Sequence, residues 1–207
     1  MNFSLCGTDY GGFLVDYDLV KQGSTIISAG VGEDISFDIG LINKKGCNVI
    51  GIDPTPKSHK FIENFPNLKN YSLIKMALHI TDEDIIEMYK NVRDDHVSES
   101  IDPTHAAVKG FDSYYSETIS LSTIFREYKD ISILKMDVEG AEYDIINNLE
   151  TIPETIKQIC LEFHHFCTDK SIEDTKDIMK KLSSMGFDNY IENPSGKSLA
   201  EITFWRK

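Results

Sequence analysis

The stretch TIISAGVGEDISFDIGLI, residues 25–42, decides how the rest of the chain is interpreted. Its apolar start, residues 25–29, is typical of a buried strand. Gly30 and Gly32 follow with one residue between them, and a periodic apolar segment begins after them. Glycines let a backbone turn tightly and approach a ligand, and the first turn of a helix has free N–H groups. The stretch therefore predicts a strand, a turn and a helix that bind a nucleotide-like ligand.

Strands and helices continue to alternate for five rounds along the chain. We expect strands at residues 25–29, 48–53, 71–79, 131–137 and 156–163. We expect helices at residues 33–44, 55–64, 81–88, 122–128, 143–149 and 171–186, the last with Ser171 as its cap. Two short strands, at 187–192 and 199–205 with a turn at 193–196, end the chain. This pattern predicts an α/β, Rossmann-like fold: a mostly parallel seven-stranded sheet with a C-terminal antiparallel hairpin, the layout of class I methyltransferases.

Two segments fall outside this alternation. Residues 1–22 are expected to be irregular, with the turn YGGF at 10–13 acting either as a cap over the sheet edge or as a flap on the ligand. Residues 91–117 are expected to form a long irregular insertion in which short strands are possible, and such an insertion in a compact domain is usually a functional lid or a disordered segment. At 207 residues, we expect residues 1–207 to be a single domain that carries this flap and this lid.

Composition and charge narrow the range of functions. The net charge of −13 argues against a nucleic-acid partner, because phosphate binding needs a basic surface. No apolar run reaches the length of a membrane span, and the first residues lack the features of a signal peptide. We therefore expect a cytoplasmic protein that does not bind membranes. The four cysteines have no C-x-x-C or zinc spacing, so free thiols are expected.

Two features separate the candidate ligands. Asp53 ends a predicted strand some twenty residues after the glycines, where a carboxylate can accept both ribose hydroxyls of either NAD or S-adenosylmethionine. A dinucleotide-binding turn needs a third glycine, and Ile35 occupies that position. Glu33 and Asp34 at the helix start would also repel a pyrophosphate. These residues favour S-adenosylmethionine over NAD.

Four ordered segments resemble the FkbM-type methyltransferases, in the branch that carries a Tyr-Gly-Gly-aromatic segment before the glycine loop. The segments are YGGF (10–13), SAGVGEDISFD (28–38), IDPTP (52–56) and LKMDVEGAE (134–142). The resemblance implies an S-adenosylmethionine-dependent methyltransferase whose glycine loop holds the methionine part of the cofactor. Asp53 would then hold the ribose, with Pro54 beside the adenine, and Asp137 would face the methionine amino group or the transferred methyl.

The resemblance also implies a set of site residues and a reaction. The implied cofactor-binding residues are Tyr10, Gly11, Ser28, Gly30, Val31, Gly32, Glu33, Asp53, Pro54, Ala77 and Asp137. Many relatives carry Asp where this chain has Ser28, so Glu33 or Asp137 could bind the methionine ammonium instead. The implied reaction is O-methylation of a small hydroxylated molecule or a carbohydrate. An NAD(P)-dependent oxidoreductase, a non-catalytic nucleoside-binding module and methylation at nitrogen or carbon stay open as alternatives.

Methyl transfer to a hydroxyl is helped by a base that takes the proton. The candidate catalytic residues follow the strands expected at 131–137 and 156–163, and they are Asp137, Glu139, Glu162 and His164. Glu142 is either catalytic or a structural carboxylate. His164 and His165 could bind a metal with Asp137 or Asp169, but adjacent histidines point apart. No metal ligand is therefore assigned.

Overall fold

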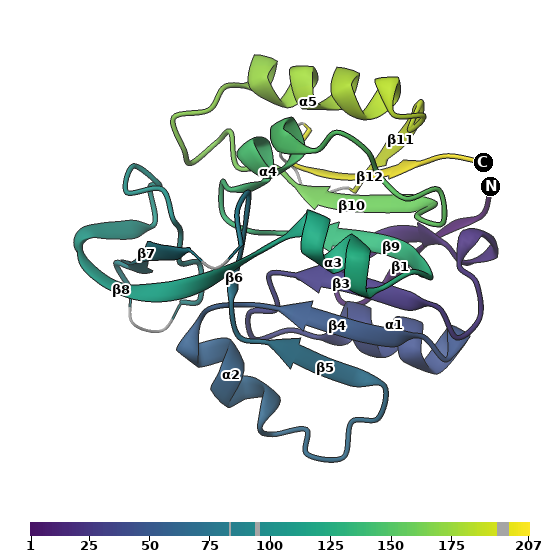
Figure 1. Ribbon diagram of the computed structural model, residues 1–207, viewed down its shortest axis with the longest axis horizontal. Coiled ribbons are helices and arrows are strands. Elements are labelled where there is room, and N and C mark those ends of the chain that lie inside the picture. The colour runs from purple at the N-terminus through teal and green to yellow at the C-terminus, as the bar shows by residue number, and fades with distance from the viewer. Residues whose placement is uncertain (83, 94–95, 194–198) are drawn as a thin grey trace.

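A computed structural model describes residues 1–82, 84–93, 96–193 and 199–207. Seven strands form the central sheet in the order β11-β12-β10-β9-β3-β4-β5 (Figure 1). The parallel strands are β3 (Thr25–Ala29), β4 (Asn48–Ile52), β5 (Tyr71–Ile74), β9 (Ile131–Met136) and β10 (Gln158–Glu162). The antiparallel strands are β11 (Asn189–Glu192) and β12 (Glu201–Trp205). The predicted fold class is confirmed; apart from Asn193, the turn expected at 193–196 lies outside the described residues.

Two apolar cores lie on the two faces of this sheet. The helices are α1 (Ser36–Lys45), α2 (Pro56–Ile62), α3 (Leu121–Glu127), α4 (Glu142–Asn148) and α5 (Ile172–Ser184). One core joins the sheet to α3, α4 and α5, and the other joins it to α1. Neighbouring residues of β9 alternate between them: Leu134 packs into the first core and Ile133 into the second. Burial on both faces explains why the parallel strands are continuous apolar runs.

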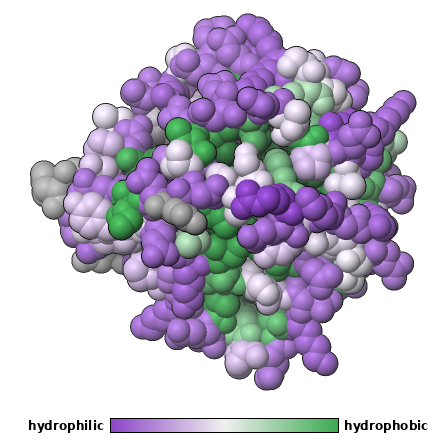
Figure 2. All heavy atoms as spheres, in the orientation of Figure 1, coloured by the Kyte–Doolittle hydropathy of each residue, from purple (hydrophilic) through white to green (hydrophobic). Residues whose placement is uncertain are grey.

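The outer surface is mostly polar. Figure 2 shows hydrophilic residues around the outside of this view and hydrophobic residues gathered along its middle. The longest described helix, α5, buries Ile178 and Leu182 and exposes Asp177 and Lys180. None of the helices in the described ranges has the length and apolar content that crossing a bilayer requires.

The N-terminal segment is an ordered hairpin. β1 (Phe3–Cys6) and β2 (Phe13–Asp16) pair in an antiparallel manner and pack into the second core. Buried Gln158 attaches this hairpin to β10, because its Oε1 accepts from Asp16 N at 2.8 Å and its Nε2 donates to Asp16 O at 3.0 Å. The expectation of an irregular segment over 1–22 is wrong, because strands of four residues are too short to show a clear periodicity.

The strand expected at 71–79 is two strands in two sheets. β5 lies at the edge of the main sheet, whereas β6 (Ala77–His79) pairs in parallel with β8 (Val108–Ser120) in a three-stranded sheet. The chain changes partners at Lys75 and Met76. A single apolar run therefore contributes to two sheets, and the run alone does not show which distant strand each half will meet.

The helix expected at 81–88 is also wrong, because these residues lead into β7 (Ile85–Asn91), which is antiparallel to β8. β8 occupies the second half of the region 91–117, which was expected to be irregular, and both strands extend to the left in Figure 1. Asp82 resembled part of a helix start. Its carboxylate instead accepts from Ser120 N at 2.7 Å and from the hydroxyl of Thr123 at 2.8 Å, so it holds Ser120, the N-cap of α3, in place.

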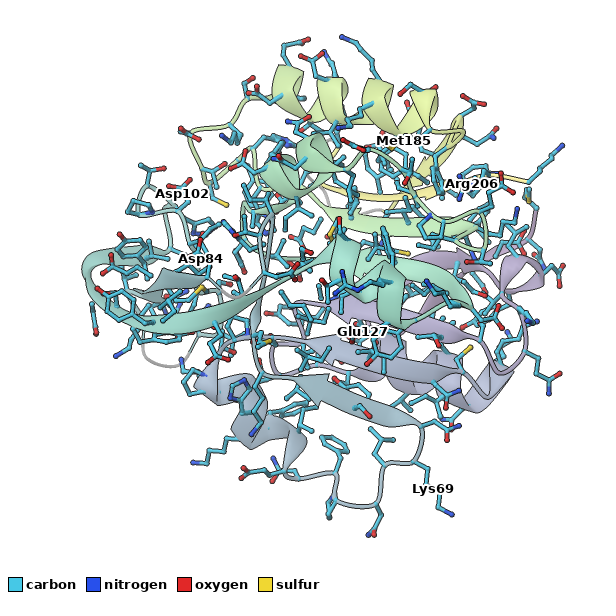
Figure 3. All side chains as sticks on the ribbon, in the orientation of Figure 1. Lys69, Asp84, Asp102, Glu127, Met185 and Arg206 are labelled. Atoms are coloured by element: carbon cyan, nitrogen blue, oxygen red, sulfur yellow. The ribbon has the colours of Figure 1, made fainter. Side chains whose placement is uncertain are left out.

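Helix ends follow their capping residues. α1 begins at Ser36 rather than Glu33, and Asp34 Oδ1 accepts from Ser36 N at 2.7 Å. Ser171 caps α5 in a capping box, as expected from the sequence. Arg206 donates to Met185 O, just after α5, at 3.1 Å, and both residues are labelled in Figure 3.

Asp38, on α1, is a buried carboxylate. It is 2% exposed, and no hydrogen-bond partner of its Oδ1 is found among the described residues. Burial raises its pKa from the ordinary 3.8 to about 6; Lys135 and Ser28 oppose the rise and Asp34 adds to it. Two further titratable groups that sense its charge are Tyr71 and Cys6.

We expect the substitution Asp38→Asn to change how stability depends on pH. The pKa of Asp38 is higher in the folded state than in the unfolded state. The stability that its protonated carboxyl contributes is therefore fully present below about pH 4 and is lost as pH rises through about 6. The free energy of unfolding of Asp38→Asn minus that of the parent should grow by up to ~3 kcal/mol from pH 4 to 7.5. Urea unfolding at both pH values measures this; a difference that stays constant, as expected for exposed Asp18→Asn, would contradict it.

Candidate active site

A cavity of about 640 Å³ opens at the C-terminal edge of the parallel strands, where open α/β sheets bind ligands. It brings together all of the sequence-predicted site residues except one. The residues that line it are Tyr10, Gly11, Gly30, Val31, Gly32, Glu33, Asp53, Pro54, Ala77, Asp137, Glu139, Glu162 and His164. The exception is Ser28, which is 1% exposed within β3 and hydrogen-bonds the carboxylate of Asp38.

Gly30 fits between two strands of the sheet. Its N–H donates to Ile52 O at 2.9 Å, and its carbonyl accepts from Lys135 Nζ at 2.5 Å. Its φ is +77°, and a Cβ added there would lie 1.7 Å from the backbone oxygen of Asp137. Only glycine fits this position, and the absence of a side chain lets the glycine loop lie directly against the end of β9.

Asp53 holds the glycine loop in place. Its Oδ2 accepts from Val31 N at 2.8 Å and from Gly32 N at 3.0 Å, and its Oδ1 accepts from the N–H and hydroxyl of Thr55 at 2.8 and 2.6 Å. A carboxylate has about four lone-pair sites. Ribose hydroxyls could therefore reach Asp53 only if one of these bonds opens, and its ribose role stays a prediction.

The turn at residues 10–13 reaches the cavity. Tyr10 and Gly11 line the cavity, and Tyr10 is 78% exposed. Thr8 Oγ1, just before the turn, donates to Asp34 Oδ2 at 2.5 Å. Burial alone would raise the pKa of Asp34, but hydrogen bonds from Thr8 and Ser36 lower it. These contacts favour the flap interpretation over a cap at the sheet edge.

His164 lies at the centre of four carboxylates and is 3% exposed. On one side, Glu142 Oε1 lies 3.0 Å from its Nδ1 and accepts from its backbone N–H at 3.0 Å. On the other side, its Nε2 faces three oxygens that line the cavity: Glu139 Oε2 at 3.4 Å, Asp137 Oδ1 at 3.6 Å and Glu162 Oε1 at 3.9 Å. Glu142 is fully buried, so it orients the imidazole and does not reach a ligand.

The cluster carries an excess of negative charge. Burial alone would lower the pKa of His164, but Glu142, Glu139 and Asp137 raise it to about 10. Burial raises the pKa of Glu162 to about 8, and repulsion from Asp137 adds to the rise. Burial is also the first cause of the raised pKa of Asp137. The carboxylates therefore resist carrying all their charges at once, and the positive charge of His164 among them offsets part of this repulsion.

Glu139 is held in a loop by the insertion that follows β7. Its φ is +52°, an uncommon conformation for a non-glycine residue, and it precedes α4, whose first residue is Glu142. Ser100 Oγ donates to its carbonyl at 2.5 Å, and His105 Nε2 lies 3.1 Å from its Oε2. The same His105 Nε2 lies 3.1 Å from Cys167 Sγ. The residues 96–107 thus contribute directly to the cavity.

Several residues that line the cavity were not predicted from the sequence. They include Glu99, Ile101, His105, Phe166 and Cys167. Glu99 is 8% exposed, accepts from Tyr114 Oη at 2.8 Å and has a pKa raised by burial. The only signal for Glu99 and His105 was the expectation that 91–117 covers the site, because nothing in their local pattern indicates a contact with Glu139.

The lining of the cavity fits a cationic cofactor. The acidic residues that line it are Asp9, Glu33, Asp34, Asp53, Glu99, Asp137, Glu139, Glu162 and Glu201. Lys135 is the one lysine or arginine among the described lining residues. S-adenosylmethionine carries a sulfonium and an ammonium, which such a cavity attracts, whereas it would repel the pyrophosphate of NAD. Pro54, Ala77 and Leu78 add an apolar wall that suits the adenine.

This sheet order and this cavity define a class I methyltransferase domain. Residues 26–188 match the methyltransferase FkbM domain, and the chain belongs to this family. The predicted family is confirmed, and so is S-adenosylmethionine as the cofactor of this domain. A human protein described as probable methyltransferase-like protein 24 is 27% identical over 167 residues, which are 78% of this chain. The chain spans 38% of the length of that relative.

Solved structures share the fold at low sequence identity. The fibrillarin pre-rRNA processing protein of Methanococcus jannaschii has a TM-score of 0.53 and 12% identity over 90% of this chain and 68% of its own. A fibrillarin/Nop5p complex has a TM-score of 0.51 and 9% identity over 91% of this chain and 75% of that chain. At such identities these likenesses concern the fold alone.

Replacing Asp53 by Ala should weaken S-adenosylmethionine binding by more than ~1 kcal/mol, about fivefold in Kd. The substitution releases the N–H groups of Val31 and Gly32 and removes the predicted ribose acceptor. Asp102→Ala is a matched control, because Asp102 Oδ1 accepts from Thr104 at the same 2.8 and 2.6 Å and does not line the cavity. Calorimetry measures both affinities, and equal values would remove Asp53 from the cofactor site.

Proposed function

We propose that this chain transfers the methyl group of S-adenosylmethionine to a hydroxyl of a small molecule, with carbohydrates among the candidate acceptors. The observation that supports this most is the position of three cavity-lining carboxylates, Asp137, Glu139 and Glu162, beside the glycine loop. A hydroxyl acceptor loses a proton on methylation, and these side chains are available to receive it. Exposed Tyr10 and Phe166 add aromatic surface to the cavity, on which a sugar or aromatic ring could pack.

In this reaction the hydroxyl oxygen attacks the sulfonium methyl carbon in line. The O–CH₃ bond forms as the S–CH₃ bond breaks, and the electron pair of the broken bond stays on sulfur in S-adenosylhomocysteine. The hydroxyl proton passes to a carboxylate of the cluster. The residues of this chain supply alignment and the proton acceptor, which are the two contributions that a methyl transfer needs from a protein.

The alternative of a hydride transfer with NAD(P) has less support. It would place a pyrophosphate at a glycine loop next to Glu33 and Asp34, in a cavity with nine acidic residues. Family membership also points to methyl transfer. The alternative of a non-catalytic nucleoside-binding module predicts cofactor affinity without turnover.

Two measurements test the proposal. We expect calorimetry to show binding of S-adenosylmethionine and S-adenosylhomocysteine, and no binding of NAD. We then expect transfer of labelled methyl to at least one member of a panel of sugars, diols and phenols. Lack of binding of both sulfur compounds at millimolar concentration would refute the proposal, and labelling confined to amines or carbon acids would refute the hydroxyl acceptor.

A further inference from the structure

We propose that Asp137, Glu162 and His164 form a binding site for a divalent transition-metal cation, of the Mn²⁺, Fe²⁺ or Zn²⁺ class. These residues come from the ends of β9 and β10, and each offers one ligand atom within 4.8 Å of the other two. His164 Nε2 lies 3.6 Å from Asp137 Oδ1 and 3.9 Å from Glu162 Oε1. Ligand atoms about 2.1 Å from a common metal are roughly 3 to 4.2 Å apart, so these distances match those around one ion.

The burial and orientation of the His164 imidazole are a second observation that points to a bound cation. The imidazole is 97% buried, and its Nδ1 is already paired with Glu142 at 3.0 Å. Its Nε2 lines the cavity, where oxygens of Asp137, Glu139 and Glu162 lie at 3.4 to 3.9 Å, beyond ordinary hydrogen-bond distance. These spacings are ion-pair distances for a protonated imidazole, and they are also of the size that a shared cation fills once Nε2 has given up its proton.

The surroundings of His164 also match a metal site. Glu142 Oε1 holds Nδ1, and its Oε2 accepts from Gly140 N at 2.9 Å, so this fully buried carboxylate is itself fixed. A carboxylate behind a ligating histidine is the usual arrangement that sets the ring orientation in metal proteins. His165 does not compete for the ion, because its Nδ1 faces Thr175 Oγ1 at 3.1 Å.

The ligand set indicates which cation and which acceptor fit. One imidazole with two carboxylates suits Mn²⁺, Fe²⁺ or Zn²⁺ better than Mg²⁺ or Ca²⁺, which prefer oxygen ligands. Three protein ligands leave open positions on the cavity side, so two adjacent oxygens of an acceptor could complete the coordination. This part rests on the proposed function and narrows its acceptor class to vicinal diols, catechols and hydroxy-carbonyl compounds. Glu139 is outside the ligand set, and although its Oε2 is paired with His105, this cavity-lining carboxylate is the one left to take the hydroxyl proton.

Metal binding is tested without cofactor or acceptor, on the full chain after dialysis against EDTA. We expect titration with MnCl₂, followed by electron paramagnetic resonance of free Mn²⁺, to show one site. Asp137→Asn and Glu162→Gln should each weaken it at least tenfold, and Glu142→Gln by about tenfold through the orientation of His164. Asp137 and Glu162 are preferred over His164 because their side chains are 32% and 25% exposed, so their replacement does not disturb the core.

Glu127→Gln is the matched control, since it removes one exposed carboxylate from α3, outside the cavity lining (Figure 3). It should leave the Mn²⁺ affinity unchanged. Absence of a Mn²⁺ site, or equal affinity in all four variants, overturns the metal site even if S-adenosylmethionine binds and methyl transfer proceeds. Conversely, a Mn²⁺ site in a chain that binds no S-adenosylmethionine leaves the metal site standing and refutes the proposed function.

Discussion

Replacing Asp137 by Asn should lower the rate of methyl transfer by at least about 100-fold while the fold stays intact. Asp137 directly follows β9, and its side chain lines the cavity between the glycine loop and His164. Asparagine keeps the shape and removes the charge that, in the proposed function, would face the sulfonium, the hydroxyl proton and the proposed cation. Because burial already raises the pKa of Asp137, removing its charge should not destabilise the protein.

Labelled-methyl turnover, far-UV circular dichroism and thermal unfolding together measure this effect. Glu127→Gln again serves as the control for loss of one negative charge, and its turnover should equal that of the parent. Parent-level turnover in Asp137→Asn would remove this residue from the mechanism. A loss of turnover accompanied by unfolding would show that Asp137 is structural instead.

The substitution Gly30→Ala should destabilise the fold by ~3 kcal/mol or more and abolish cofactor binding. The φ of +77° alone costs an alanine roughly 1–2 kcal/mol. The new Cβ would also lie 1.7 Å from the backbone oxygen of Asp137, so β9 and the glycine loop must separate. That movement would open the cavity at the point where Lys135 and Ile52 hold Gly30.

Gly46→Ala isolates the contribution of backbone conformation. Gly46 ends α1 with a φ of +62°, and nothing lies within 4 Å of a Cβ added there. We expect Gly46→Ala to cost about 1–2 kcal/mol in urea unfolding and to leave S-adenosylmethionine affinity unchanged. If Gly30→Ala costs no more than Gly46→Ala, the close approach of the glycine loop to β9 is not what stabilises this edge.

Local patterns predicted the central sheet well because its strands are short apolar runs closed by turn residues. Thr25–Ala29 was predicted with its observed bounds, and Ser171 was recognised as the cap of α5. Local sequence patterns gave wrong predictions where a residue bonds to or pairs with a segment far along the chain. Asp82 accepts a hydrogen bond from Ser120, the N-cap of α3, 38 residues later, and the run that contains Ala77 changes sheets because β8 lies beside it.

The residues of the cavity show the same contrast between what local patterns predict and what contacts between distant segments decide. Parallel strands end at one edge of a sheet, so the order of the strands was enough to expect Gly30, Asp53 and Asp137 in one place, and the cavity contains all three. Glu99 and His105 were not expected there. They lie in the connection between β7 and β8, and their contacts depend on how this connection packs against the ends of the parallel strands.

The sequence by itself determined the fold class, the family and the positively charged cofactor, because strand order, glycine spacing and the excess of acidic residues are carried by the linear pattern. Only the tertiary structure decided the roles of individual side chains. It engages Asp53 with the N–H groups of the glycine loop, buries Ser28 and places Glu142 behind His164. The physical reason is that hydrogen bonds, burial and close approach depend on which distant segments meet, and a linear pattern does not specify the angstrom-scale distances between them.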